Sequence, residues 1–216
     1  MNLDEARAQM LGQQIRAWEV LDDRVLGVLG QILRESFVPD EYHELAFADL
    51  EIPLAHGQRM MTPKVEGRLL QALCLAPGDD VLEIGTGTGF LTACLARLAN
   101  SVVSVDIHED FSRNARTRFG QLEAGDVEFR TKDALTMGHE EQFDAIAVTG
   151  SIPEFDDHFI RMLRPGGRLF MIVGRAPVME ARVVTMHQRG EYAQESLFES
   201  VITPLVNAEL PEPFVL

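Results

Sequence analysis

Cysteine is scarce in this chain of 216 residues, which contains only Cys74 and Cys94. Each lies in a stretch with a helical pattern of apolar residues. We interpret both as buried free thiols in a reducing compartment, with a disulfide or a reactive thiol as the alternative. Two cysteines without a CxxC pair give no zinc pattern. The sequence therefore predicts a cytoplasmic protein with no disulfide framework and no metal.

Long apolar runs and clusters of basic residues are also missing. No stretch has the length that spans a bilayer, and the first residues, MNLDEARAQMLGQQ, lack the apolar segment of a signal peptide, so we expect no membrane partner. Only 19 residues are Lys or Arg against 34 Asp or Glu, which gives a formal net charge of -15. Such a surface repels polyanions, and the sequence therefore disfavours a nucleic-acid partner.

The chain does contain enough apolar sequence for one α/β domain, because 46% of its residues are hydrophobic. We expect an N-terminal helix capped by Asn2 and a second helix that starts at Asp22 and ends before Pro39. Residues 40–62 have no regular pattern, and a third helix begins at Pro63. The N-terminal third is therefore predicted to be helical, with an irregular segment before the core.

Strands and helices alternate in the rest of the chain, which predicts a mostly parallel sheet with helices on both faces. A β-rich run on each side of residues 188–191 predicts a C-terminal hairpin, and residues 209–216 read as an extended tail. We expect one domain over 1–216, with a substrate-loop region at 1–62, a cofactor-binding core at 63–175 and C-terminal strands at 176–216. The core strands are expected at 80–84, 101–105, 127–129, 143–148 and 168–173, and its helices at 88–99, 109–120 and 154–163.

The most informative pattern is VLEIGTGTGF, residues 81–90, in which a buried strand runs into a glycine-rich turn and then a helix. Glycines let a ligand approach the backbone, and the helix start offers free N–H groups. The spacing is G-x-G-x-G and not the G-x-G-x-x-G of dinucleotide folds. Asp106 ends the next strand, where a carboxylate can accept hydrogen bonds from a ribose diol. Asp133 follows the third strand, where it can meet an adenine amino group.

Each of these features has a plainer interpretation. The glycines can serve only to connect strand and helix, Asp106 can be a solvated strand end, and Asp133 can be a turn or cap aspartate. Their agreement in order and spacing favours a site for a nucleoside cofactor.

The same segments resemble class I S-adenosylmethionine methyltransferases, which have a Rossmann-like fold. VLEIGTGTGF is similar to their motif I, while residues 143–150 and 163–169 are similar to later strands of that fold. The resemblance implies a seven-stranded sheet with one reversed strand, and S-adenosyl-L-homocysteine as the product. We expect Glu83 to orient the glycine turn. The cofactor-binding candidates are Glu83, Gly85, Thr86, Gly87, Thr88, Gly89, Asp106, Ile107, Asp133, Ala134 and Thr149.

The segment IPLAHGQRMMTP, residues 52–63, resembles the signature loop of protein-L-isoaspartate O-methyltransferases, which reads roughly I-G-x-G-Q-T-I-S-x-P. Phe37-Val38-Pro39 and Thr203-Pro204-Leu205-Val206 are also similar to that family. The resemblance implies methylation of the misplaced α-carboxylate of isoaspartyl residues in damaged proteins, which starts their repair through a succinimide. Isoaspartyl-containing proteins or peptides are then the expected partners.

The loop departs from that pattern. Thr62 is interpreted as the counterpart of the serine that holds the acceptor carboxylate, and therefore as the catalytic candidate; its alternative role is an N-cap before Pro63. His56, Gln58 and Arg59 are the substrate-binding candidates. Arg59 can pair with the acceptor carboxylate or be a solvated loop residue, and His56 is expected to line the pocket or to be structural because an ionised acceptor needs no base.

Three other functions remain open at this stage. The altered loop favours a different acceptor, or a cofactor-binding homologue that has lost catalysis. A nucleic-acid methyltransferase is disfavoured because residues 148–153 read VTGSIP where amino-methylating DNA enzymes usually carry Asn/Asp-Pro-Pro-aromatic.

Asp156-Asp157-His158 is interpreted as capping of a helix start and not as a metal site.

Overall fold

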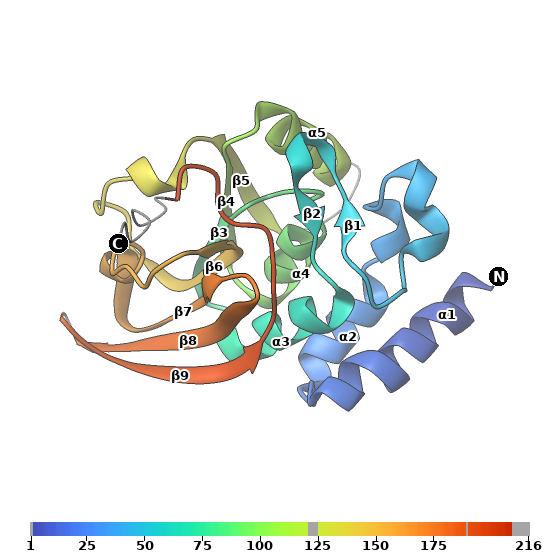
Figure 1. The fold of residues 1–216 in the computed structure, drawn as a ribbon, viewed down its shortest axis with the longest axis horizontal. Coiled ribbons are helices and arrows are strands. Elements are labelled where there is room, and N and C mark those ends of the chain that lie inside the picture. Colours follow the sequence, from blue (N-terminus) through green and yellow to red (C-terminus); the bar gives the residue numbers. More distant parts are fainter. Residues whose placement is uncertain (1, 121–124, 189, 209–216) are drawn as a thin grey trace, which may run out of the picture.

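A computed structural model of the chain describes residues 2–120, 125–188 and 190–208 (Figure 1). The expected tail at 209–216 and residue 189 of the expected hairpin turn lie outside these ranges. None of the helices within them is long and apolar enough to cross a membrane. The same ranges contain no group of three His, Cys, Asp or Glu side chains that could hold a metal ion.

Seven strands form one sheet, in the spatial order β5-β4-β3-β6-β7-β8-β9. The first five strands in this order pair in parallel, and β8 is antiparallel to both of its neighbours. The predicted sheet with one reversed strand and a C-terminal hairpin is thus confirmed. The strands are β3 (Asp80–Ile84), β4 (Ser101–Asp106), β5 (Asp126–Thr131), β6 (Phe143–Ile152), β7 (Leu163–Arg175), β8 (Val178–Gln188) and β9 (Glu191–Glu199).

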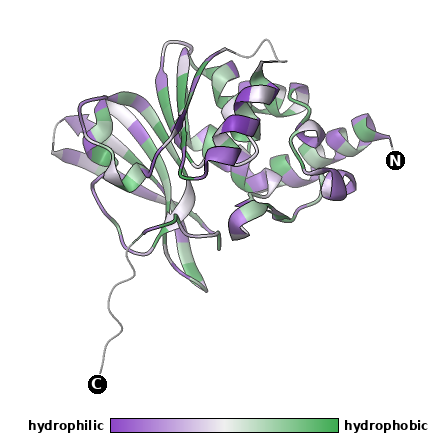
Figure 2. Ribbon diagram, turned by 90° about the horizontal axis from the view of Figure 1, so that it is seen from above, coloured by the Kyte–Doolittle hydropathy of each residue, from purple (hydrophilic) through white to green (hydrophobic). Residues whose placement is uncertain are grey.

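Four helices pack on one face of this sheet through a single apolar cluster. The helices carry hydrophilic and hydrophobic residues side by side in Figure 2, as expected for elements with one buried side. They are α2 (Asp23–Gln31), α3 (Pro63–Leu73), α4 (Phe90–Leu98) and α5 (Glu109–Phe119).

The opposite face of the sheet is covered without a long helix. Its apolar cluster is closed by two 3-10 helices, Ala134–Thr136 and Ile160–Met162, and the segments around them. The helix predicted over 154–163 is therefore wrong except for its last turn. The side chain of Asp156 accepts a hydrogen bond from the backbone N–H of His158, so the expected capping aspartate closes a local turn just before the 3-10 helix Ile160–Met162.

The N-terminal part wraps the open side of the helical layer. Helix α1 (Leu3–Gln9) is capped by Asn2, as predicted, and runs on into π and 3-10 turns up to Trp18. Helix α2 ends at Gln31, earlier than expected, because Ile32 takes an extended conformation. The segment expected to be irregular at 40–62 contains a short antiparallel pair, β1 (Ile52–Pro53) and β2 (Arg59–Met60).

A buried arginine ties these N-terminal segments to the core. Arg34 is 1% exposed and forms an ion pair with the buried Glu66 of α3. It also donates to the carbonyl oxygen of Ala46 at 2.9 Å and to that of Met61 at 2.8 Å. Burial raises the pKa of the Glu66 carboxyl to about 7 even with this partner. One side chain thus fixes the backbone at the end of the loop that precedes α3.

Candidate active site

A cleft of about 750 Å³ opens at the carboxyl ends of the parallel strands, where ligands bind in open α/β sheets. Strands β3, β4 and β6 supply its floor, the β1–β2 loop covers one side, and the segment 202–206 closes another. Seven of the predicted cofactor-binding residues line it: Gly85, Gly87, Asp106, Ile107, Asp133, Ala134 and Thr149.

The glycine turn after β3 needs its glycines for steric reasons. Gly85 has a φ of 96°, and a Cβ at this position would lie 2.1 Å from the Oγ1 of Thr149. That hydroxyl donates to the carbonyl oxygens of Ile84 and Gly85 at 2.9 and 3.0 Å. Gly87 has a φ of 51°, which L side chains rarely adopt, and a Cβ there would make only an ordinary contact with Leu54, 3.8 Å from its Cδ1. The turn is therefore held from β6 while its backbone stays accessible from the cleft.

Asp106 is fixed in the cleft by two backbone amides. Its Oδ2 accepts from the N–H of Gly87 at 3.0 Å, and its Oδ1 accepts from the N–H of His108 at 2.9 Å. Burial raises the pKa of this carboxyl, and the two amides oppose that rise. Each carboxylate oxygen has a further lone pair, so the group is oriented and able to accept from ligand hydroxyls.

Asp133 performs the plainer role that the sequence also allowed. Its Oδ1 accepts from the N–H of Leu135 at 2.9 Å and caps the 3-10 turn that follows. Its Oδ2 accepts from the side chain of Asn207 at 2.9 Å. Because the residue also lines the cleft, capping and a contact to a bound base are compatible, and the adenine contact stays a prediction.

The other four cofactor candidates stand behind the cleft wall and do not line it. Glu83 is fully buried, and its Oε2 accepts from Thr92 at 2.5 Å and from Ser104 at 2.6 Å. The hydroxyls of Ser104 and Thr86 lie 2.7 Å apart, which links this cluster to the glycine turn. Burial raises the pKa of Glu83 to about 8. The hydrogen-bonded cluster around Glu83 thus supports the glycine turn from beneath. Thr86, Thr88 and Gly89 lie in the turn before α4.

The β1–β2 loop brings two of its predicted substrate residues, Gln58 and Arg59, to the cleft. His56 turns away from it: its Nε2 lies 3.0 Å from both carboxylate oxygens of Asp110, and its ring stacks on His108 with centroids 4.0 Å apart. His56 has a φ of 57°. It therefore anchors the loop to the start of α5.

Thr62 is not among the residues that line the cleft. It occupies the N-cap position of α3, but its side chain makes no capping hydrogen bond, and its Oγ1 is buried without a partner among the described residues. Met61 does line the cleft. Counted from Gln58, Met61 is the third residue, the place of the serine in G-Q-T-I-S, so the match of that serine to Thr62 was one residue off.

Several residues that line the cleft were not predicted as site residues, because they do not belong to the cofactor motif or to the signature loop. His108 and Phe111 follow the end of β4, and Leu205 belongs to the C-terminal segment. That segment is held against β6 by two backbone hydrogen bonds, from Ser151 to Thr203 at 3.0 Å and from Leu205 to Ser151 at 2.9 Å. The likeness of residues 203–206 to the family was the only signal that pointed there.

Comparison with known proteins identifies the family of the chain. The family model described as Protein-L-isoaspartate(D-aspartate) O-methyltransferase matches residues 5–210. Protein-L-isoaspartate O-methyltransferases from Koribacter versatilis and Pelobacter propionicus are 34% and 35% identical to the chain, over 93% and 96% of it and 90% and 93% of their own lengths.

Solved structures show the same fold. A Plasmodium falciparum protein described as a beta-aspartate methyltransferase, in complex with S-adenosyl-L-homocysteine, superposes with a TM-score of 0.78 over 95% of this chain and 98% of its own, at 18% identity. A protein-L-isoaspartate O-methyltransferase gives the same TM-score over 92% of this chain and 65% of its own, at 21% identity. By its sequence and its fold, the chain belongs to the protein-L-isoaspartate(D-aspartate) O-methyltransferase family.

Proposed function

We propose that this protein transfers a methyl group from S-adenosylmethionine to the free α-carboxylate of L-isoaspartyl residues in damaged proteins, as the first step of their repair. Family membership supports this activity. The observation that carries the proposal is that one cleft joins the glycine turn and Asp106 to the loop with Gln58 and Arg59. This arrangement supports a donor site and an acceptor site that are next to each other.

The residues of the cleft fit S-adenosylmethionine. Gly87 lines the cleft and has no side chain, which lets a ligand approach its backbone. Asp106 is oriented to accept from a ribose diol, and Ile107 and Ala134 offer apolar surface for a base next to Asp133. The cofactor supplies a methyl group on an electrophilic sulfonium. The acceptor carboxylate is ionised near neutral pH, so no side chain has to remove a proton. The protein contributes mainly by holding the two reactants in line.

At the acceptor end we assign the carboxylate to Arg59. Its side chain is half exposed, and its nearest acidic partner is Glu51, with 3.9 Å between the Arg59 Nε and a Glu51 oxygen. No described group accepts a hydrogen bond from this guanidinium, so its donors are available to a carboxylate. Gln58 lines the same end of the cleft. Thr62 stays a candidate because its buried hydroxyl has no partner among the described residues.

One observation favours a second candidate function, a methyltransferase of the same fold with another acceptor. Met61 places a thioether at the position where the family's loop has a serine, and Met61 lines the cleft. A thioether offers a carboxylate no hydrogen-bond donor. If Arg59 does not replace the missing hydroxyl, the acceptor differs from an isoaspartyl residue.

We also propose a cytoplasmic location, with isoaspartyl-containing proteins as the partners. The two cysteines are free. Cys94 is fully buried, as predicted, and burial raises the pKa of its thiol well above the ordinary value. The prediction of a buried thiol is wrong for Cys74, which is exposed because it takes a left-handed conformation at the end of α3. Free thiols are typical of reducing compartments. Separating the cell into cytoplasmic and other fractions and probing each for the protein tests this location.

The deciding experiment measures transfer of labelled methyl groups from S-adenosylmethionine to an isoaspartyl peptide, with the matching aspartyl peptide as the control. We expect base-labile label on the isoaspartyl peptide alone. Cofactor binding without label on either peptide would contradict the proposal and favour another acceptor or a homologue that has lost catalysis.

A further inference from the structure

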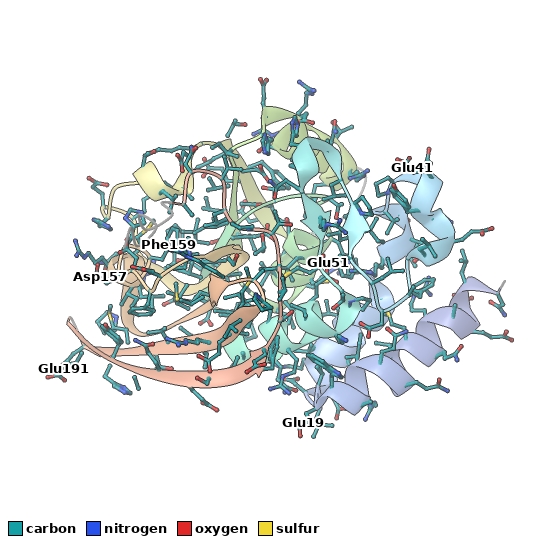
Figure 3. All side chains as sticks on the ribbon, in the orientation of Figure 1. Glu19, Glu41, Glu51, Asp157, Phe159 and Glu191 are labelled. Carbon is teal, nitrogen blue, oxygen red and sulfur yellow. The ribbon has the colours of Figure 1, made fainter. Side chains whose placement is uncertain are left out.

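A second cleft of about 790 Å³ lies beside the first one. The end of β7 and the first residue of the turn to β8, residues 174–176, form one wall, and Val201 belongs to another. Five residues line both clefts, so the two are continuous past the loop. The shared residues are Glu51, Arg59, Ile202, Thr203 and Pro204; Glu51 is labelled in Figure 3.

The second cleft carries more positive than negative charge, in a chain whose formal net charge is -15. Arg59 and Arg175 are its two cations, and Glu51 is its only acidic residue. Arg175 is exposed and forms no ion pair with any residue in the described ranges. Burial raises the pKa of the Glu51 carboxyl, and Arg59 opposes that rise. With Glu51 close to Arg59, Arg175 is left as a cation available to a ligand.

The part of the lining formed by residues 201–204 suits an extended polypeptide. Val201 is 51% exposed, which leaves an apolar side chain at the rim. Among the described residues, no group accepts a hydrogen bond from the backbone N–H of Val201 or of Thr203. Polypeptide chains bind in this way when free backbone groups give affinity and neighbouring side chains give specificity.

We propose that the second cleft holds the polypeptide on one side of the methylated residue, and that Arg175 selects acceptors with an acidic side chain there. This inference rests on the proposed function, because it takes the acceptor to be part of a polypeptide chain. Arg175 lies outside the first cleft, so it acts on the choice of acceptor and does not touch the reacting atoms.

The test uses pairs of isoaspartyl peptides that differ in a single residue, which is Glu in one peptide and Gln in the other. This residue is placed in turn at each of the three positions before and each of the three positions after the isoaspartyl residue. Their affinity for the protein with S-adenosyl-L-homocysteine is measured by fluorescence anisotropy, and methyl transfer is measured in parallel. On one side we expect Glu to bind roughly two- to fivefold more tightly than Gln at low salt, the range of an exposed ion pair. High salt should remove the difference.

Two variants test whether the preference for Glu over Gln comes from Arg175. In Arg175→Gln the difference between the Glu and Gln peptides should vanish. In Arg97→Gln it should persist, because Arg97 is an exposed arginine of α4 that lines neither cleft. Equal binding of Glu and Gln peptides at every position, a preference that survives in Arg175→Gln, or no peptide binding at all would overturn the inference. Binding with the expected preference but without methyl transfer would count against the proposed function alone.

Discussion

Replacing Asp106 with Asn should weaken cofactor binding through the ribose. The carboxylate accepts from two backbone amides, those of Gly87 and His108, and we propose that it also accepts from the ribose diol. Asparagine keeps one oxygen and turns an NH₂ donor toward one of the amide donors. A hydrogen bond to a charged group contributes about 1.5–3 kcal/mol, so the dissociation constant should rise roughly 10- to 150-fold.

Isothermal titration calorimetry with S-adenosyl-L-homocysteine measures this change, and thermal unfolding shows whether the variant stays folded. Asp126→Asn is the matched control, since Asp126 is an exposed residue at the start of the neighbouring strand β5 and lines neither cleft. A cofactor analogue without ribose hydroxyls separates the direct contact from damage to the glycine turn. In Asp106→Asn the analogue and the normal ligand should bind alike. If removing the hydroxyls weakens binding as much in the variant as in the original protein, the two effects are independent and the ribose contact is refuted.

Three further changes test the rest of the site. Gly85→Ala places a Cβ 2.1 Å from the Thr149 hydroxyl, so calorimetry should show cofactor affinity reduced more than about tenfold. Arg59→Gln should raise the KM for the isoaspartyl peptide by about tenfold or more and leave the cofactor dissociation constant unchanged. A rise in KM in Thr62→Val but not in Arg59→Gln would move the carboxylate contact to Thr62. The buried Glu83 has its pKa raised from 4.5 to about 8, so its contribution to stability is present below pH 4.5 and is lost as the pH rises through 8. Urea unfolding at pH 5.5 and pH 8.5 should therefore show a smaller loss of stability for Glu83→Gln than for the original protein, and equal losses would contradict the buried-acid assignment.

Local sequence patterns were sufficient to predict those parts of the fold whose conformation is set by residues close together in the sequence. The glycine turn at 85–89 and Asp106 were found because a buried strand, a special backbone and a strand end occur within a few residues. The helix predicted near 154–163 is wrong because β6 extends to Ile152 and only residues 160–162 of that segment are helical; the face is covered by these residues together with Ala134–Thr136 and the segments around them. Helical spacing cannot tell a covering helix from a covering loop with the same apolar residues.

The residues at the acceptor end of the cleft are brought together by contacts between distant parts of the chain. The spacing of residues in the sequence does not reveal such contacts. Residues 202–206 reach the cleft only because Ser151 pairs with them across about fifty residues of sequence. His56 was expected to line the pocket or to be structural, and its contacts with Asp110 and His108 favour the structural role. Counting from Gln58 matches the family's serine to Met61, and Met61 is also the residue of the two that lines the cleft.

The buried Arg34 also determines whether the acceptor loop can be moved to another protein. Its guanidinium holds Met61 in the loop, Ala46 before it and Glu66 after it. A loop transplanted without this arginine would leave the buried carboxyl of Glu66 without its counter-ion, and breaking such a pair costs about 3–5 kcal/mol. Residues 34–66 therefore form the smallest piece in which the loop and its support can be exchanged together between relatives, and only the part of acceptor preference that lies in Gln58 and Arg59 is transferred with it.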